Sequence, residues 1–208
     1  DNVSLYINRG IALSGQGKTN DAMADFDKGL DLAAKRLDTF LSVVRQMSNA
    51  VPGGIAVDHL KARLAADPQN TGALVGLIQV YLTNEQYAEA LKLLDPILAD
   101  QKSTLRPKLL GMAALAHYQI KDFDVARQIY EEVLIQQPDD LETLNNLAFL
   151  LAEDLKRPAD GLKYAEKAVK VLKSKPQEVV YVNNGNVLDT LGWLKYLNGD
   201  NKGAAEEL

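Results

Sequence analysis

Apolar residues recur through most of this 208-residue chain at the spacing of one face of an α-helix. Between residues 107 and 138 the pattern predicts two short amphipathic helices joined by a tight turn. Leu110 and Ala113 mark the apolar face of the first helix, and Tyr130 and Val133 mark that of the second. The same pattern recurs in both directions along the chain. It predicts an array of helical hairpins that stack on one another.

A small residue recurs where the second helix of each hairpin begins. The intervals between consecutive small residues are 34, 34, 36, 35 and 43 residues, and the residues are Ala22, Ala56, Ala90, Ala126, Gly161 and Ala204. Small side chains at a fixed interval let paired helices approach closely in every hairpin. The turn at 15–21, GQGKTND, is expected to cap the second helix of the first hairpin with Asn or Asp.

Six repeats are predicted in a single solenoid over residues 1–208, and they lie at 3–36, 37–70, 71–104, 107–140, 141–174 and 186–208. The second repeat fits least well, because no Gly or Pro separates Leu30 from Ala50. One continuous helix there is an open alternative, although the interval of 34 residues favours a turn near 33–36. The segment 173–186 interrupts the array as a loop or an irregular helix start. The last repeat is cut off inside its second helix, so we expect the chain to be a fragment of a longer protein.

This register resembles the tetratricopeptide repeat, a hairpin of about 34 residues with small packing residues at fixed places. The resemblance covers almost the whole chain and extends to the sixth repeat, where VLDTLGWLKYLNGD is similar to a first helix and its turn. It implies an all-α, right-handed superhelical solenoid of antiparallel helix pairs. It also implies that first helices line a concave groove, where a peptide or protein partner binds.

The resemblance identifies candidate groove residues on the first helices. Carried over position by position, the candidates are Asn8, Arg45, Gln79, Lys108, Met112, Tyr118, Asn145, Asn146, Phe149 and Trp193. Near the centre, the rings of Tyr118 and Phe149 would anchor a partner, and the amides of Asn145 and Asn146 would hold its backbone. Each of these residues also has a purely structural interpretation: Tyr118 and Trp193 pack between helices, and the two Asn lie on a solvated face.

Two better-known binding patterns of the resembled family are not reproduced. One branch grips a C-terminal carboxylate with a Lys, Asn and Arg set, but Ile7 and Ile11 stand where its first Lys and Asn would be. Another branch lines its groove with a ladder of Asn, and only Asn8 and Asn146 occupy those positions here. The resemblance therefore predicts a groove without naming its occupant.

The charge, the residue types and the missing motifs of the sequence argue against several classes of function. The net charge of −5 argues against a nucleic-acid partner, because such proteins usually carry a basic face. The absence of Cys excludes thiolate metal sites and a Cys nucleophile, and His59 and His117 show no metal-ligand spacing. No apolar run is long enough to span a membrane. The sequence has no P-loop, GxGxxG or GxSxG motif, so we expect neither a catalytic site nor a cofactor or metal.

The leading interpretation is a bacterial, non-catalytic scaffold that binds a protein or peptide partner in its groove. Two alternatives stay open. In the first alternative, the chain is a recruiting or regulatory module of a larger enzyme or of an envelope-assembly protein. In the second, it assembles with copies of itself through the exposed end of its last repeat. The compartment, cytoplasmic or periplasmic, is left open by the sequence.

Overall fold

The computed structural model describes residues 2–174 and 184–207, which form α-helices joined by short turns. Twelve helices lie within these residues, and no strand does. The expected all-α fold of paired helices is therefore confirmed. Most of the predicted loop at 173–186 lies outside the described residues.

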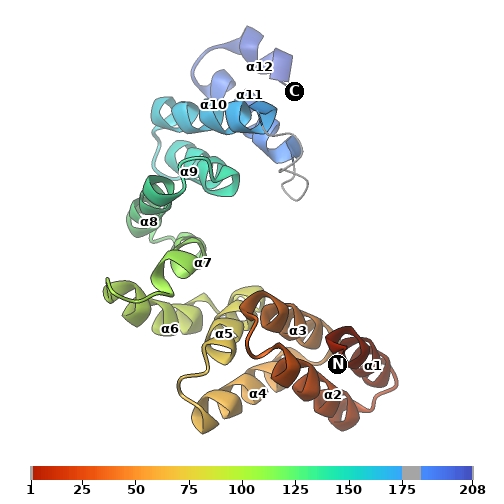
Figure 1. Cartoon of the computed structure of the whole chain (residues 1–208). Coiled ribbons are helices and arrows are strands. Elements are labelled where there is room, and N and C mark those ends of the chain that lie inside the picture. The colour runs from red at the N-terminus through yellow and green to blue at the C-terminus, as the bar shows by residue number, and fades with distance from the viewer. Residues whose placement is uncertain (1, 175–183, 208) are drawn as a thin grey trace. The chain divides into compact units, whose positions relative to one another are not determined.

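The helices follow one another along the chain in pairs, each joined by a short connection (Figure 1). The pairs are α1 (Val3–Gly15) with α2 (Thr19–Ala33), α3 (Leu37–Ala50) with α4 (Gly53–Ala66), α5 (Thr71–Thr83) with α6 (Tyr87–Ala99), α7 (Arg106–Gln119) with α8 (Phe123–Gln136), α9 (Leu141–Glu153) with α10 (Pro158–Ser174), and α11 (Asn184–Leu197) with α12 (Asn201–Glu207). The chain between Ala33 and Leu37 is a turn, which confirms the turn predicted in the second repeat.

The recurring small residues lie in the core, as their spacing predicts. Five are alanines that are at most 5% exposed, from Ala22 to Ala204, and Gly161 is buried with them. A Cβ atom added to Gly161 would lie 2.6 Å from the backbone oxygen of Ala148 in α9, which is too close for any side chain. The closeness of α9 and α10 therefore depends on this glycine.

The turns inside the hairpins use one residue in the left-handed region. These residues are Gly17, Glu85, Lys121, Lys156 and Gly199, with φ between 56° and 85°. In the second repeat, Val51 and Pro52 join α3 to α4 in an extended conformation instead. The predicted Asn or Asp cap of α2 is wrong. The helix begins at Thr19 after Lys18, which makes no side-chain cap hydrogen bond.

Two compact units make up the chain, Asp1–Pro96 and Ile97–Leu208. In the first unit, α3 packs against α1, α2, α4 and α5. In the second unit, α9 packs against α8, α10 and α11, and α11 also packs against α10 and α12. Each unit thus contains neighbouring first helices that lie side by side, α1, α3 and α5 in one and α9 and α11 in the other. A single solenoid over residues 1–208 stays a prediction.

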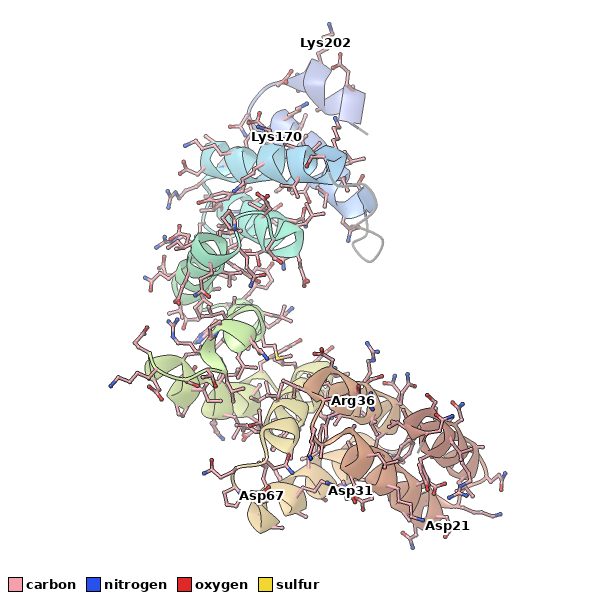
Figure 2. All side chains as sticks on the ribbon, in the orientation of Figure 1. Asp21, Asp31, Arg36, Asp67, Lys170 and Lys202 are labelled. Atoms are coloured by element: carbon pink, nitrogen blue, oxygen red, sulfur yellow. The ribbon has the colours of Figure 1, made fainter. Side chains whose placement is uncertain are left out.

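Charged side chains cover the outside of both units (Figure 2). In the first unit they also join helices: the Arg63 guanidinium of α4 donates to Asp27 at 2.6 Å and to Asp31 at 2.7 Å, both on α2. In the second unit, Arg106 of α7 pairs with Glu132 of α8. Such pairs orient one helix against the next, although partly exposed pairs add little stability.

Candidate functional site

A hollow of about 240 Å³ lies between α7 and α9 in the second unit. Its lining residues come from α7, α8 and α9 and are Leu115, Tyr118, Gln119, Tyr130, Asn145, Asn146 and Phe149. Helical spacing explains the grouping, because residues three and four apart share one face of a helix. The residues of α7 and those of α9 each meet that condition, so the two faces oppose each other across the hollow.

A second hollow of about 350 Å³ continues the first. The two share Leu115, Tyr130 and Asn146, and the second adds Lys108 and Met112 of α7. It also adds acidic groups, Asp140 and Glu142, at the start of α9. We call the lining residues of both hollows the α7–α9 groove.

Aromatic rings extend the groove toward α11. The ring of Phe149, which is 41% exposed, stacks on the ring of Trp193 with centroids 5.8 Å apart and planes 29° apart. The Tyr118 ring meets the ring of Phe123 of α8, with centroids also 5.8 Å apart. The rings are therefore held in place by neighbours while part of their surface stays open, an arrangement that suits anchoring contacts.

Both tyrosines of the groove keep their hydroxyl protons at ordinary pH. Burial raises the pKa of Tyr118, and the nearby carboxylate of Asp154 raises it further. Burial also raises the pKa of Tyr130, followed by the carboxylate of Glu142, and a hydrogen bond with the Asn146 side chain opposes part of this rise. Neutral hydroxyls both donate and accept hydrogen bonds, so they can pair with a peptide backbone.

Two buried oxygen atoms near Tyr118 lack hydrogen-bond donors. Among the described residues, Oδ1 of Asn145 and Oδ2 of Asp154 are covered from solvent and accept no hydrogen bond. A buried acceptor without a donor costs about 1–3 kcal/mol. Near Tyr118, these two oxygen atoms are therefore free to accept hydrogen bonds from a donor outside the chain.

Of the ten candidates, six line the groove and a seventh contacts it. Lys108, Met112, Tyr118, Asn145, Asn146 and Phe149 line the two hollows, and Trp193 stacks on Phe149. The three candidates in the first unit lie elsewhere: Asn8 of α1 and Arg45 of α3 are exposed, and Gln79 of α5 is half-buried. A hollow in that unit is lined by other residues, among them Ser4, Ile7 and Ser42.

Sequence reasoning missed several residues of the groove, and Leu115 and Tyr130, which border both hollows, are the most informative. Leu115 lies 34 residues before Phe149 and is 38% exposed, so its place in the repeat register could have identified it. Tyr130 was placed among the packing residues of α8, and it is indeed only 3% exposed. No signal in the sequence shows that its buried side chain also borders a hollow.

The histidines have structural surroundings. His59 lies 2.8 Å from a carboxylate oxygen of Asp27, and His117 lies 3.2 Å from one of Asp122. Within residues 2–174 and 184–207, no group of three or more His, Asp or Glu side chains is arranged to hold a metal ion. Over the same residues, no helix combines the length and apolar character that a membrane span requires.

Comparisons with known proteins agree with the repeat pattern. Family models described as tetratricopeptide repeat match residues 3–36 and 54–115. No curated protein matches the sequence. Solved structures that resemble the fold include the following three proteins.

PilW, described as a widely conserved type IV pilus biogenesis factor, is 14% identical, with 99% of this chain and 90% of that chain covered and a TM-score of 0.70. PilF of Pseudomonas aeruginosa is 18% identical, and the match covers 99% of this chain and 88% of that chain with a TM-score of 0.66. MamA of Desulfovibrio magneticus RS-1 is 15% identical, and the match covers 83% of this chain and 96% of that chain with a TM-score of 0.60.

At these identities the solved structures bear on the fold alone, and the bacterial names among them are consistent with a bacterial origin. The small residues at the repeat interval, the paired helices that bury them and the two family matches lead to one conclusion. The chain is a tetratricopeptide-repeat protein, with repeats matched at residues 3–36 and 54–115.

Proposed function

We propose that this chain is a non-catalytic scaffold that binds an extended segment of a protein partner in the α7–α9 groove. The observation that carries the proposal is the meeting of aromatic rings and side-chain amides in one hollow, at Tyr118, Asn145, Asn146 and Phe149. Rings supply contact area at low entropic cost, and amides pair with either group of a peptide backbone. Tetratricopeptide repeat proteins generally mediate protein–protein interaction, which agrees with this use of the groove.

The exposure of apolar groups on the groove favours binding over a structural role. Leu115 and Phe149 are more than a third exposed, and both line the hollow. An exposed apolar side chain contributes little to folding, whereas the same side chain gains free energy when a partner covers it. The length of the groove, which runs from Lys108 to Tyr118 along α7, fits an extended segment.

The test uses a displayed library of random linear peptides, selected on the whole chain. Recovered peptides are then titrated against the wild-type chain and a Tyr118→Ala, Phe149→Ala double variant by calorimetry. Trp193 is the single Trp of the chain and stacks on Phe149, so its fluorescence in the wild type reports occupation of the groove. We expect the double variant to bind at least about 100-fold more weakly, because anchors of this kind cost about 2 kcal/mol or more each when truncated.

Ile135→Ala is the matched control. Ile135 lies on α8 in the same unit and is 81% exposed, and neither hollow includes it. The control should bind the peptides as the wild type does. Equal binding by wild type and a folded double variant would show that the partner docks elsewhere.

A second candidate function is an assembly module of a bacterial envelope structure. It is favoured by the shared fold of PilW, a type IV pilus biogenesis factor, across 99% of this chain. Site-specific cross-linking from position 115 in living cells distinguishes the two. Capture of a structural envelope component supports this second candidate, and capture of a protein outside any envelope assembly argues against it.

A further inference from the structure

The Tyr118 end of the α7–α9 groove is rich in acceptors and poor in donors. Oδ1 of Asn145 and Oδ2 of Asp154 have no donor in the described part of the chain. Burial and the Asp154 carboxylate both keep the Tyr118 hydroxyl neutral, and Phe149, which is 41% exposed, lines the same hollow. Rings and acceptors together are the surroundings in which a cationic side chain is stable.

The charges around the groove favour the same occupant. Of the residues that line the two hollows, Asp140 and Glu142 are acidic and Lys108 is basic. At the other end of α9, Glu153 pairs with Lys156 at 3.7 Å, but no Lys, Arg or His of the described residues forms an ion pair with Asp154. The Tyr118 side chain is hydrogen-bonded to the Asp154 carboxylate, but that bond brings no positive charge. A half-buried carboxylate without a cationic partner attracts a cation more strongly than a fully solvated one does.

The size of the first hollow indicates what part of a partner it receives. Its volume of about 240 Å³ is smaller than the roughly 300–1,000 Å³ of sites that enclose whole small molecules. A single long side chain of a partner segment suits that volume, while the rest of the segment lies along the second hollow.

We propose that the partner segment inserts an Arg or Lys side chain at the Tyr118 end of the groove, between the rings of Tyr118 and Phe149. The proposal rests on the groove binding proposed above and adds the chemistry of the anchor. The cationic group lies against the rings and donates hydrogen bonds to Asn145 and Asp154. Because both oxygen atoms are covered in the free chain, the half-buried Tyr118 side chain moves aside as the cation enters.

The experiment starts from the peptides that the library selection recovers on the whole chain. We expect these peptides to share an Arg or Lys at one position. Each peptide is then synthesised again with citrulline at that position, since citrulline has the shape of Arg without its charge. The citrulline peptide should bind the wild-type chain about tenfold more weakly, and raising the salt concentration should weaken the Arg peptide more than the citrulline peptide.

The variant Asp154→Asn tests the residue on the protein side. It should lower the affinity for the Arg peptide about tenfold and leave the affinity for the citrulline peptide unchanged, because the two changes remove the same interaction. Asp124→Asn is the matched control, since Asp124 is exposed on α8 and lines neither hollow. It changes the net charge equally and should leave both affinities as they are.

The outcomes separate this inference from the proposed function. Peptides that require Tyr118 and Phe149 but carry no basic residue, or that bind equally well with citrulline, overturn the cationic anchor and leave the groove proposal standing. Peptides that bind regardless of Tyr118 and Phe149 overturn the groove proposal itself. The citrulline comparison uses the wild-type chain alone, so it decides the question even if Asp154→Asn disturbs the end of α9.

Discussion

The two units are built from the same repeat but place their aromatic residues differently. In the first unit, Phe26 and Phe40 are at most 1% exposed and fill the core. In the second unit, Phe149 is 41% exposed and Trp193 is half-buried against it. The small residues that set the helix spacing are the same in kind in both units. The fold therefore leaves the first-helix surface free to differ, and this difference is the reason why we propose the second unit as the binding one.

One register position makes the contrast clear. The residue eleven positions before the small packing residue is Ile11, Arg45 and Gln79 in the first unit. The corresponding residues of the second unit are Leu115 and Trp193, and Phe149 takes this place in the fifth repeat, where the turn between helices is one residue longer. At equivalent places, the first unit thus has one apolar residue and two polar ones, whereas the second unit has three apolar residues. None of these six residues is fully buried, although Trp193 packs partly against the core of the second unit, so core packing constrains this position only weakly.

The largest expected effect separates the two kinds of phenylalanine. Phe40→Ala removes a ring that is 1% exposed in the first unit, and we expect it to lower the free energy of unfolding by about 3–5 kcal/mol. Phe149→Ala should lower it by less than about 1 kcal/mol, because the exposed ring buries less area. Urea denaturation followed by circular dichroism measures both. Similar losses in the two variants would remove the distinction between a core ring in one unit and a binding ring in the other.

The next effect concerns glycines at helix contacts. A Cβ added at Gly161 would meet the backbone oxygen of Ala148 at 2.6 Å, whereas one added at Gly10 would meet the Phe26 ring at 3.0 Å. A backbone cannot move aside as a ring can, so Gly161→Ala should cost about 2 kcal/mol and Gly10→Ala clearly less. Urea unfolding followed by circular dichroism measures both variants, and Trp193 fluorescence reports in addition on the second unit, which contains Gly161.

Gly111→Ala is the control for the glycine series. Gly111 lies on α7, and a Cβ added there would meet nothing within 4 Å. This variant should gain up to about 1 kcal/mol, because Ala favours the helix over Gly. A loss of stability at Gly111, or a gain at Gly161, would contradict the packing described for α7 to α10.

The small residues at a fixed interval were enough to predict the fold. Ala22 and Ala126 could be placed in helix contacts because a repeated interval multiplies a weak local signal. The cap of α2 could not be predicted, because Thr19, Asn20 and Asp21 are all suitable first-turn residues and their order does not select one. The repeat register thus predicts the helix contacts, whereas the residue types of one turn do not predict which residue caps the helix.

The candidate site was predictable only in part, for a related reason. The register places Asn145 and Phe149 on the first-helix face, and the structure shows that they line one hollow. The register also places Asn8 and Arg45 on that face, but the hollow described in the first unit is lined by other residues, among them Ile7 and Ser42. A hollow forms where side chains of several helices leave space, and that depends on packing that one helix pattern does not contain.

The smallest expected effect compares one carboxylate in each unit as pH falls. The Arg9 guanidinium binds Asp25 through two hydrogen bonds of 2.5 Å and holds the pKa of that buried carboxyl below its usual range. Lys163 and Arg157 lower the pKa of Asp160 in the same direction, but the Asp160 side chain is 36% exposed, whereas that of Asp25 is 5% exposed. Pairs that are open to water contribute less to folding.

The sign follows from the lowered pKa. A carboxyl group with a lower pKa in the folded state contributes stability that is complete above its unfolded pKa of about 3.9 and is lost as pH falls through the folded value. Asp25→Asn should therefore be less stable than the wild type at about pH 7, and the difference should shrink as the pH approaches about 3. Asp160→Asn should show a smaller difference at both pH values. Urea midpoints of the three proteins across this range test the comparison, and a larger pH-dependent loss in Asp160→Asn would place the stronger ion pair in the second unit.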